Sequence, residues 1–160
     1  MNCETLSVAE AGNLRHYQIN ENNMKLAITY AELQDYVAGH FKKNVNLGYV
    51  DEATVSVSVP INVFGFTKLV SINIIVKKIE GTDLFLSYDG KMGIDMLVSP
   101  ALSYAKKLVP GKADWVELMP GNILKLRLGD IDKLQKVFEK LKLNNIFFEQ
   151  GNIVVDASLL

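Results

Sequence analysis

The sequence predicts an α+β domain in which amphipathic helices cover the apolar face of a long, curved, mainly antiparallel sheet. Two segments of about ten residues alternate apolar and polar side chains, which is the period of a half-buried strand. Three other segments repeat apolar residues at helical spacing. Short turn sequences that contain glycine separate neighbouring strands, so hairpins and antiparallel pairing are expected. The predicted order of elements is α-βββ-α-ββ-α-ββ.

The first predicted helix follows a polar segment. Residues 1–24 are predicted to form an arm, and residues 25–160 are predicted to form one domain. Thr29 and Glu32 fit a capping box, in which the threonine side chain accepts a hydrogen bond from the backbone N–H three residues on. The helix is therefore expected to begin after Thr29 and to end near Asn44. Its apolar side carries Leu33, Val37 and Phe41.

Three predicted strands follow this helix. Two long strands are expected over residues 53–63 and 70–79, with a turn between them, and a third over residues 84–88. Pro60 has no backbone N–H to donate, so it indicates a sheet edge or a bulge. The apolar face of the long strands includes Val55, Val57, Ile72 and Ile74.

A second helix and two hairpins are predicted in the rest of the chain. Ser99 followed by Pro100 is typical of a helix start, and residues 96–98 form either a lead-in or an earlier turn of the same helix. The apolar stripe of this helix includes Leu102 and Ala105. Asp130 is predicted to cap a third helix that ends near residue 141. Hairpins are expected over residues 115–128 and 146–159.

The motifs of common catalytic and metal centres are missing from the sequence. It contains no phosphate-binding glycine loop, no histidine pair at metal-ligand spacing and no nucleophile motif, and it has one cysteine. We therefore predict a protein that is not an enzyme and that needs no metal and no cofactor. An enzyme with an unrecognised site remains an alternative, for which Asp89, Asp95 and His40 are the nominated residues.

The charge balance argues against a nucleic-acid partner. Seventeen Lys and Arg face 18 Asp and Glu, so the net charge is −1 and there is no general basic surface. Lysines do gather on the third predicted helix, at Lys133, Lys136 and Lys140. They form either a solvated helix face or a contact surface for anionic lipid headgroups or an acidic protein.

The sequence also leads to an expectation about the cellular location of the protein. No stretch of about 18 apolar residues suggests a transmembrane helix. The first residues have no basic segment followed by an apolar one, as a signal peptide would. A cytoplasmic protein is expected from the chain as it stands, and a cell-envelope protein if an export signal has been removed.

The two long aliphatic strands allow two interpretations of the apolar face. The helices either cover it completely and make a dry core, or they leave a groove that fits an acyl chain. Each buried CH₂ group contributes roughly 0.8 kcal/mol, so a chain of about fourteen carbons would gain on the order of 10 kcal/mol before entropy losses.

The pattern of residues 25–160 resembles bacterial members of the tubular lipid-binding (TULIP-like) group, in particular the small YceB-like lipoproteins. The similarity lies in the capped helix at 28–33, the two long one-faced strands, the helix at 99–108 and the closing segment at 147–155. The sequence differs from that group in lacking an export signal and lipobox, and in its additional helix at 130–141.

This resemblance implies a curled sheet around a helix, with an elongated apolar groove that holds lipid. The groove residues would be those of the apolar stripes named above: Leu33, Val37, Phe41, Val55, Val57, Ile72, Ile74, Leu102 and Ala105. The expected function is non-enzymatic binding of a lipid or other long apolar ligand. The alternative is a protein-interaction or structural module with a fully packed core.

Overall fold

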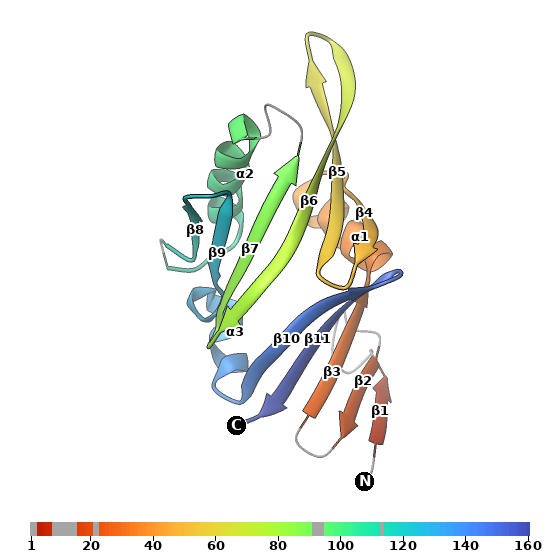
Figure 1. Cartoon of the computed structure of the whole chain (residues 1–160), viewed down its shortest axis with the longest axis vertical. Helices are drawn as coiled ribbons and strands as arrows, with labels where there is room; N and C mark the ends of the chain where they lie inside the picture. The colour runs from red at the N-terminus through yellow and green to blue at the C-terminus, as the bar shows by residue number, and fades with distance from the viewer. Residues whose placement is uncertain (1–2, 8–15, 21–22, 91–94, 113) are drawn as a thin grey trace.

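The computed structural model describes residues 3–7, 16–20, 23–90, 95–112 and 114–160. It confirms the α+β class and the antiparallel pairing, with the strands divided between two sheets. Sheet A has the strand order β1-β2-β3-β11-β10, and sheet B has the order β4-β5-β6-β7-β9-β8. Figure 1 shows sheet A below sheet B, with both chain ends at the lower end of the molecule.

Sheet A joins the two ends of the chain. Its strands are β1 (Cys3–Ser7), β2 (His16–Asn20), β3 (Asn23–Thr29), β10 (Leu141–Glu149) and β11 (Asn152–Leu159). The described part of the predicted arm therefore contains two strands, and β2 pairs with β3. The predicted closing hairpin is confirmed, with a longer first strand than expected.

Sheet B contains the long strands predicted from the sequence. Its strands are β4 (Asn46–Asp51), β5 (Thr54–Val63), β6 (Phe66–Glu80), β7 (Asp83–Gly90), β8 (Val116–Met119) and β9 (Ile123–Arg127). Strand β4 was not predicted. Its pairing with β5 extends to Ser58, so Pro60 lies just beyond the covered part of β5, at a free sheet edge as predicted.

Three α-helices connect these strands: α1 (Tyr30–Phe41), α2 (Asp95–Leu108) and α3 (Asp132–Phe138). The cap of α1 is as predicted, because the backbone N–H of Glu32 donates to Thr29 Oγ1 at 3.0 Å. The chain leaves α1 through Lys42, which has a φ of 56°.

The predicted caps at Ser99 and Asp130 are wrong. Helix α2 begins at Asp95, so it includes the earlier turn expected at residues 96–98, and Pro100 lies inside the helix. Helix α3 begins at Asp132 after Ile131, whose apolar side chain makes no capping hydrogen bond. Asp130 ends a short 3-10 turn, Leu128–Asp130, instead of capping α3. Among the described helices, none is long and apolar enough to cross a membrane.

The two sheets meet at a small buried cluster. Tyr30, Val55 and Phe148 form its centre, and they come from α1, β5 and β10. Tyr30 Oη donates to the backbone carbonyl of Glu149 at 2.7 Å. The backbone N–H of Phe148 donates to the carbonyl of Glu52 at 2.8 Å, which joins β10 to the β4–β5 turn.

Candidate functional site

One face of sheet B is apolar across neighbouring strands. The register places Val55 opposite Ile74 and Val57 opposite Ile72. Ile74 in turn lies opposite Tyr88 of β7. Directly opposed residues of antiparallel strands point to the same side of a sheet, so these side chains share one surface. We call this surface the apolar face.

Helix α1 packs on the apolar face through its first residue. Tyr30 is buried in the cluster with Val55, and burial raises the pKa of its hydroxyl, with a smaller contribution from the nearby Tyr49. Three predicted groove residues follow Tyr30 at positions i+3, i+7 and i+11, which places them on the same side of the helix. They are Leu33, Val37 and Phe41, and each is half-buried.

Helix α2 packs on the same face further along the sheet. Leu102 and Val98 contact a second cluster, centred on Tyr88 and Leu124. Ala105 lies one turn beyond Leu102 and is half-buried. The two helices approach each other where Lys43, just after α1, places its Nζ 5.6 Å from the centre of the Tyr104 ring on α2.

The nine predicted groove residues are thus distributed over one face and the two helices on it. Val57 and Ile74 pack with the first cluster, whereas Ile72 and Ile74 pack with the second, so Ile74 belongs to both. Val55 is buried, and the other eight residues are only half-buried. These eight side chains keep part of their surface accessible to solvent.

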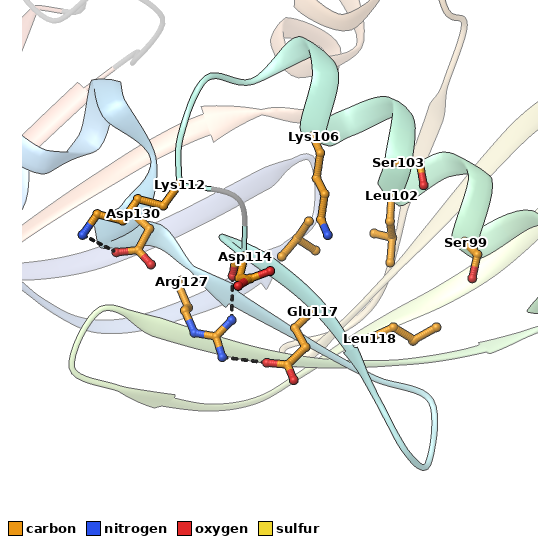
Figure 2. A pocket seen from close by; sticks show the side chains of 11 residues that line it. Ser99, Leu102, Ser103, Lys106, Lys112, Asp114, Glu117, Leu118, Arg127 and Asp130 are labelled. Carbon is orange, nitrogen blue, oxygen red and sulfur yellow. Dashed lines mark hydrogen bonds and ion pairs between the residues drawn. The ribbon is translucent and has the colours of Figure 1, made fainter.

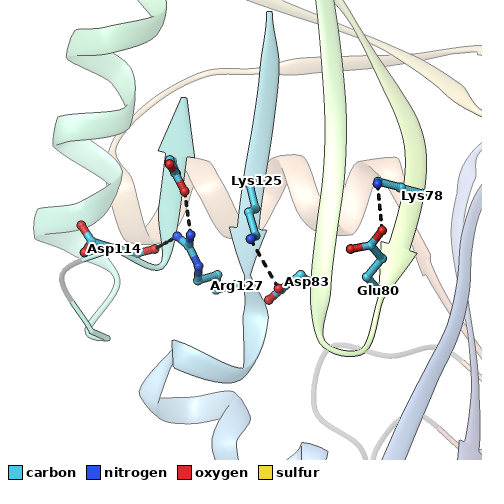
Figure 3. A network of polar contacts seen from close by, with 7 residues as sticks. Lys78, Glu80, Asp83, Asp114, Lys125 and Arg127 are labelled. Atoms are coloured by element: carbon cyan, nitrogen blue, oxygen red, sulfur yellow. Dashed lines mark hydrogen bonds and ion pairs between the residues drawn. The ribbon is translucent and has the colours of Figure 1, made fainter. Parts of the chain in front are cut away.

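The opposite face of sheet B is charged. Phe85 is buried there beneath two lysines: Lys78 Nζ lies 4.7 Å and Lys125 Nζ 5.4 Å from the ring centre. Lys78 pairs with Glu80 at 2.8 Å, and Lys125 with Asp83 at 3.8 Å (Figure 3). The hydrogen bond from Lys78 lowers the pKa of the Glu80 carboxyl. Polar side chains and lysine stems thus occupy this part of the face.

An open cleft of about 750 Å³ lies between α2 and the edge strand β8 (Figure 2). Arg127 Nη2 lies 2.6 Å from Glu117 Oε2, and Arg127 Nη1 donates to the backbone carbonyl of Asp114 at 2.6 Å. The hydrogen bond to Glu117 raises the pKa of the Arg127 guanidinium. Lys112 Nζ lies 3.7 Å from Asp130 Oδ1. The rim of this cleft is therefore a set of paired charges, which favours a polar occupant over an acyl chain.

The other nominated residues lie outside these two regions. Lys133 and Lys136 on α3 and Lys140 just after it are exposed. His40 is also exposed at the end of α1, where its ring stacks on Tyr36 with centroids 4.0 Å apart. Asp89 is exposed on β7, and the side chain of Asp95 lies outside the described part. Among the described residues, no group of three or more His, Cys, Asp or Glu is arranged to hold a metal ion.

Sequence reasoning missed one prominent surface, the tip of the β5–β6 hairpin. Phe64 is 96% exposed and Phe66 78% exposed. The signal was present in the sequence, because two phenylalanines flank the turn glycine Gly65. The turn itself was predicted, but an exposed aromatic surface at its tip was not.

Comparisons with protein-family models, with curated proteins and with solved structures returned no match.

Proposed function

We propose that this chain binds a lipid or another long apolar ligand on the apolar face of sheet B, between α1 and α2, and that it does so without catalysis. The observation that carries the proposal is the incomplete burial of eight of the nine predicted groove residues. Aliphatic side chains beneath packed helices are usually among the most buried residues of a domain. Here they retain accessible apolar surface that a ligand would cover.

Covering this accessible apolar surface would also stabilise the protein. Burial of apolar surface contributes about 25 cal/mol per Å², so an occupied face would be more stable than an empty one.

The resemblance of residues 25–160 to the TULIP-like group leads to the same ligand class. It rests on the order of the capped helix, the long strands and the second helix. Of these parts, the cap at Thr29 and the β5–β6 pairing have the expected local geometry. Lipid binding itself is what we propose from them.

A groove-filling variant tests the site. Ala105 is half-buried on the side of α2 that carries Leu102, whereas Ala101 in the same helix is exposed. Ala105→Trp should fill the space and weaken binding of a fluorescent fatty acid at least tenfold, whereas Ala101→Trp should leave it unchanged. Native mass spectrometry of the purified wild-type protein should also show an added mass that dissociates as an acyl-chain compound. Equal binding by the two variants would reject the assigned site.

A second function, a protein-interaction module, is favoured by the two packed clusters and by the exposed lysines. In that case Tyr88 and Leu124 represent a filled core, and Lys133, Lys136 and Lys140 contact an acidic protein surface. This alternative predicts no fatty-acid binding by the wild-type protein. It also predicts that reversing the three lysine charges abolishes a defined protein contact.

A further inference from the structure

The β5–β6 hairpin extends beyond the rest of sheet B (Figure 1). The pairing of β4 ends at Ser58, and the pairing of β7 with β6 ends at Ile72. Five further residue pairs continue the hairpin to Val63 opposite Phe66. At about 3.4 Å per residue, this two-stranded ribbon is roughly 17 Å long.

The end of this ribbon carries large apolar side chains in solvent. Phe64 is 96%, Phe66 78% and Leu69 59% exposed. Together with Lys68 we call these residues the hairpin tip. Within the described structure, this is the place where three strongly exposed large apolar residues lie within six positions of one another. A concentrated patch of this kind is typical of a contact surface.

The backbone of the turn strengthens this interpretation. Phe64 has a φ of 51° and Gly65 a φ of 81°, so both central residues are left-handed, as in a type I′ turn. Asn-Gly is the preferred pair at such a turn, and a bulky residue with positive φ is strained. Phe64 therefore serves neither the local backbone nor the packing of the domain. A partner outside the chain would account for its exposed ring.

We propose that the hairpin tip inserts shallowly into the boundary between headgroups and acyl chains of a lipid bilayer. Phe66 and Leu69 are three positions apart on β6, so their side chains lie on opposite sides of the ribbon. Phe64 lies at the end between them. A protein groove would contact one side of such a ribbon, whereas fluid hydrocarbon surrounds both sides and the end.

The charge of the ribbon fits a membrane surface. Residues 54–76 contain one charged side chain, Lys68, and no Asp or Glu. No carboxylate has to leave water when the tip enters the boundary, and Lys68 is attracted to anionic headgroups. Backbone groups at the two ribbon edges need water or another partner, so deep insertion is unfavourable. The tip should enter, and the rest of the ribbon should stay in the aqueous phase.

The experiment measures flotation of the protein with vesicles of phosphatidylcholine, and with vesicles that also contain phosphatidylglycerol. The main variant is Phe64→Asn, because asparagine suits the turn and should preserve folding. Leu160→Asn is the matched control, since Leu160 is 75% exposed at the chain end. We expect Phe64→Asn to weaken vesicle binding at least tenfold and Leu160→Asn to leave it unchanged. Lys68→Gln should remove most of the difference between the two vesicle types.

Insertion depth is tested with Phe64→Trp. The added tryptophan should shift its emission to the blue on vesicle binding and be quenched by lipids brominated near the headgroup end of the acyl chain. Absence of vesicle binding by the wild-type protein, or equal binding by Phe64→Asn, would overturn the proposal. Tip-dependent dimers in sedimentation velocity without vesicle binding would also overturn it and identify a second copy as the partner.

This inference rests on the hairpin tip and is independent of the proposed ligand site. Phe64→Asn should retain fatty-acid binding if the apolar face is the site, and Ala105→Trp should retain vesicle binding. If one proposal fails, the other can therefore still be tested.

Discussion

Replacing Tyr30 by phenylalanine tests how the two sheets are joined. Tyr30 is 7% exposed, and its hydroxyl donates to the carbonyl of Glu149 in sheet A at 2.7 Å, while its ring packs on Val55 of sheet B. Tyr30→Phe removes the hydroxyl and keeps the ring. The variant thus isolates a hydrogen bond that links residues 119 positions apart.

The expected cost is about 1 kcal/mol, the usual net value of one such hydrogen bond. For a chain of this length, that loss lowers Tm by about 3 °C. Tyr30→Ala also removes the buried ring and should cost about 3–5 kcal/mol. Thermal and urea unfolding of the three proteins, followed by circular dichroism, measure both differences. The separation between the two variants shows how much the ring contributes relative to the hydroxyl.

The same hydroxyl predicts a dependence on alkaline pH. Burial raises the pKa of Tyr30 above its ordinary value of 10.0, so the folded state favours the neutral form. This contribution to stability is fully present below about pH 10 and is lost as pH rises through the higher folded-state pKa. Tyr30→Phe should therefore lose less stability than the wild type between pH 9 and pH 11. Suppose that Tyr30→Phe were as stable as the wild type at neutral pH and lost the same amount of stability at alkaline pH. The proposed role of the Tyr30 hydroxyl in linking the two sheets would then be refuted.

Two further predictions concern glycine packing and a surface ion pair. Gly111→Ala should destabilise by more than about 1 kcal/mol, because its Cβ would lie 2.7 Å from the backbone oxygen of Asp130 and 3.2 Å from Trp115 Cδ1. Gly39→Ala in α1 is the control: its Cβ meets no atom within 4 Å, so alanine should stabilise by up to about 1 kcal/mol in chemical denaturation. Lys78→Met should raise the pKa of Glu80 toward its ordinary value in a carbon-13 NMR titration, because it removes the hydrogen bond that lowers this pKa. An unchanged Glu80 titration would mean that the 2.8 Å pair does not persist in solution.

The elements that were predicted correctly are those determined by residues close together in the chain. The capping hydrogen bond at Thr29 depends on residues three positions apart. The β5 and β6 strands depend on a period of two within one segment, and the turn between them depends on Gly65. At each of these places, the residues that determine the structure are neighbours in the chain, so a reading along the sequence could find them.

Strands β3 and β4 were not predicted, for different reasons. Strand β3 pairs with β11 across most of the chain, from Thr29 opposite Asn152 to Asn23 opposite Ser158. Strand β4 pairs with its neighbour β5 but contains Gly48, where an added Cβ would lie 2.7 Å from Ser56 Oγ. Glycine weakens the strand pattern of this segment, although it permits the close approach of β5.

The candidate site, too, was predicted only in those parts that depend on local sequence. The apolar stripes of α1, α2 and the long strands were identified from periodicity, but their arrangement on one face follows from the pairing of β5, β6 and β7. The polar cleft could not have been found, because it joins α2 to the edge strand β8 without a sequence motif. The aromatic tip could have been found, because two phenylalanines around a turn glycine are local.

The register of β5 and β6 connects the two proposed surfaces. Val59 lies opposite Val70, between the pair Val57–Ile72 on the apolar face and the pair Ile61–Lys68 nearer the tip. All these pairs point to the same side of the sheet, because each is two positions from the next. Ala105 lies on α2 and Phe64 at the hairpin tip, so the effects of variants at these two places on the unfolding free energy should add within about 0.5 kcal/mol. A double variant Ala105→Trp with Phe64→Asn measures this sum, and a larger coupling would mean that the ribbon transmits changes between the tip and the apolar face.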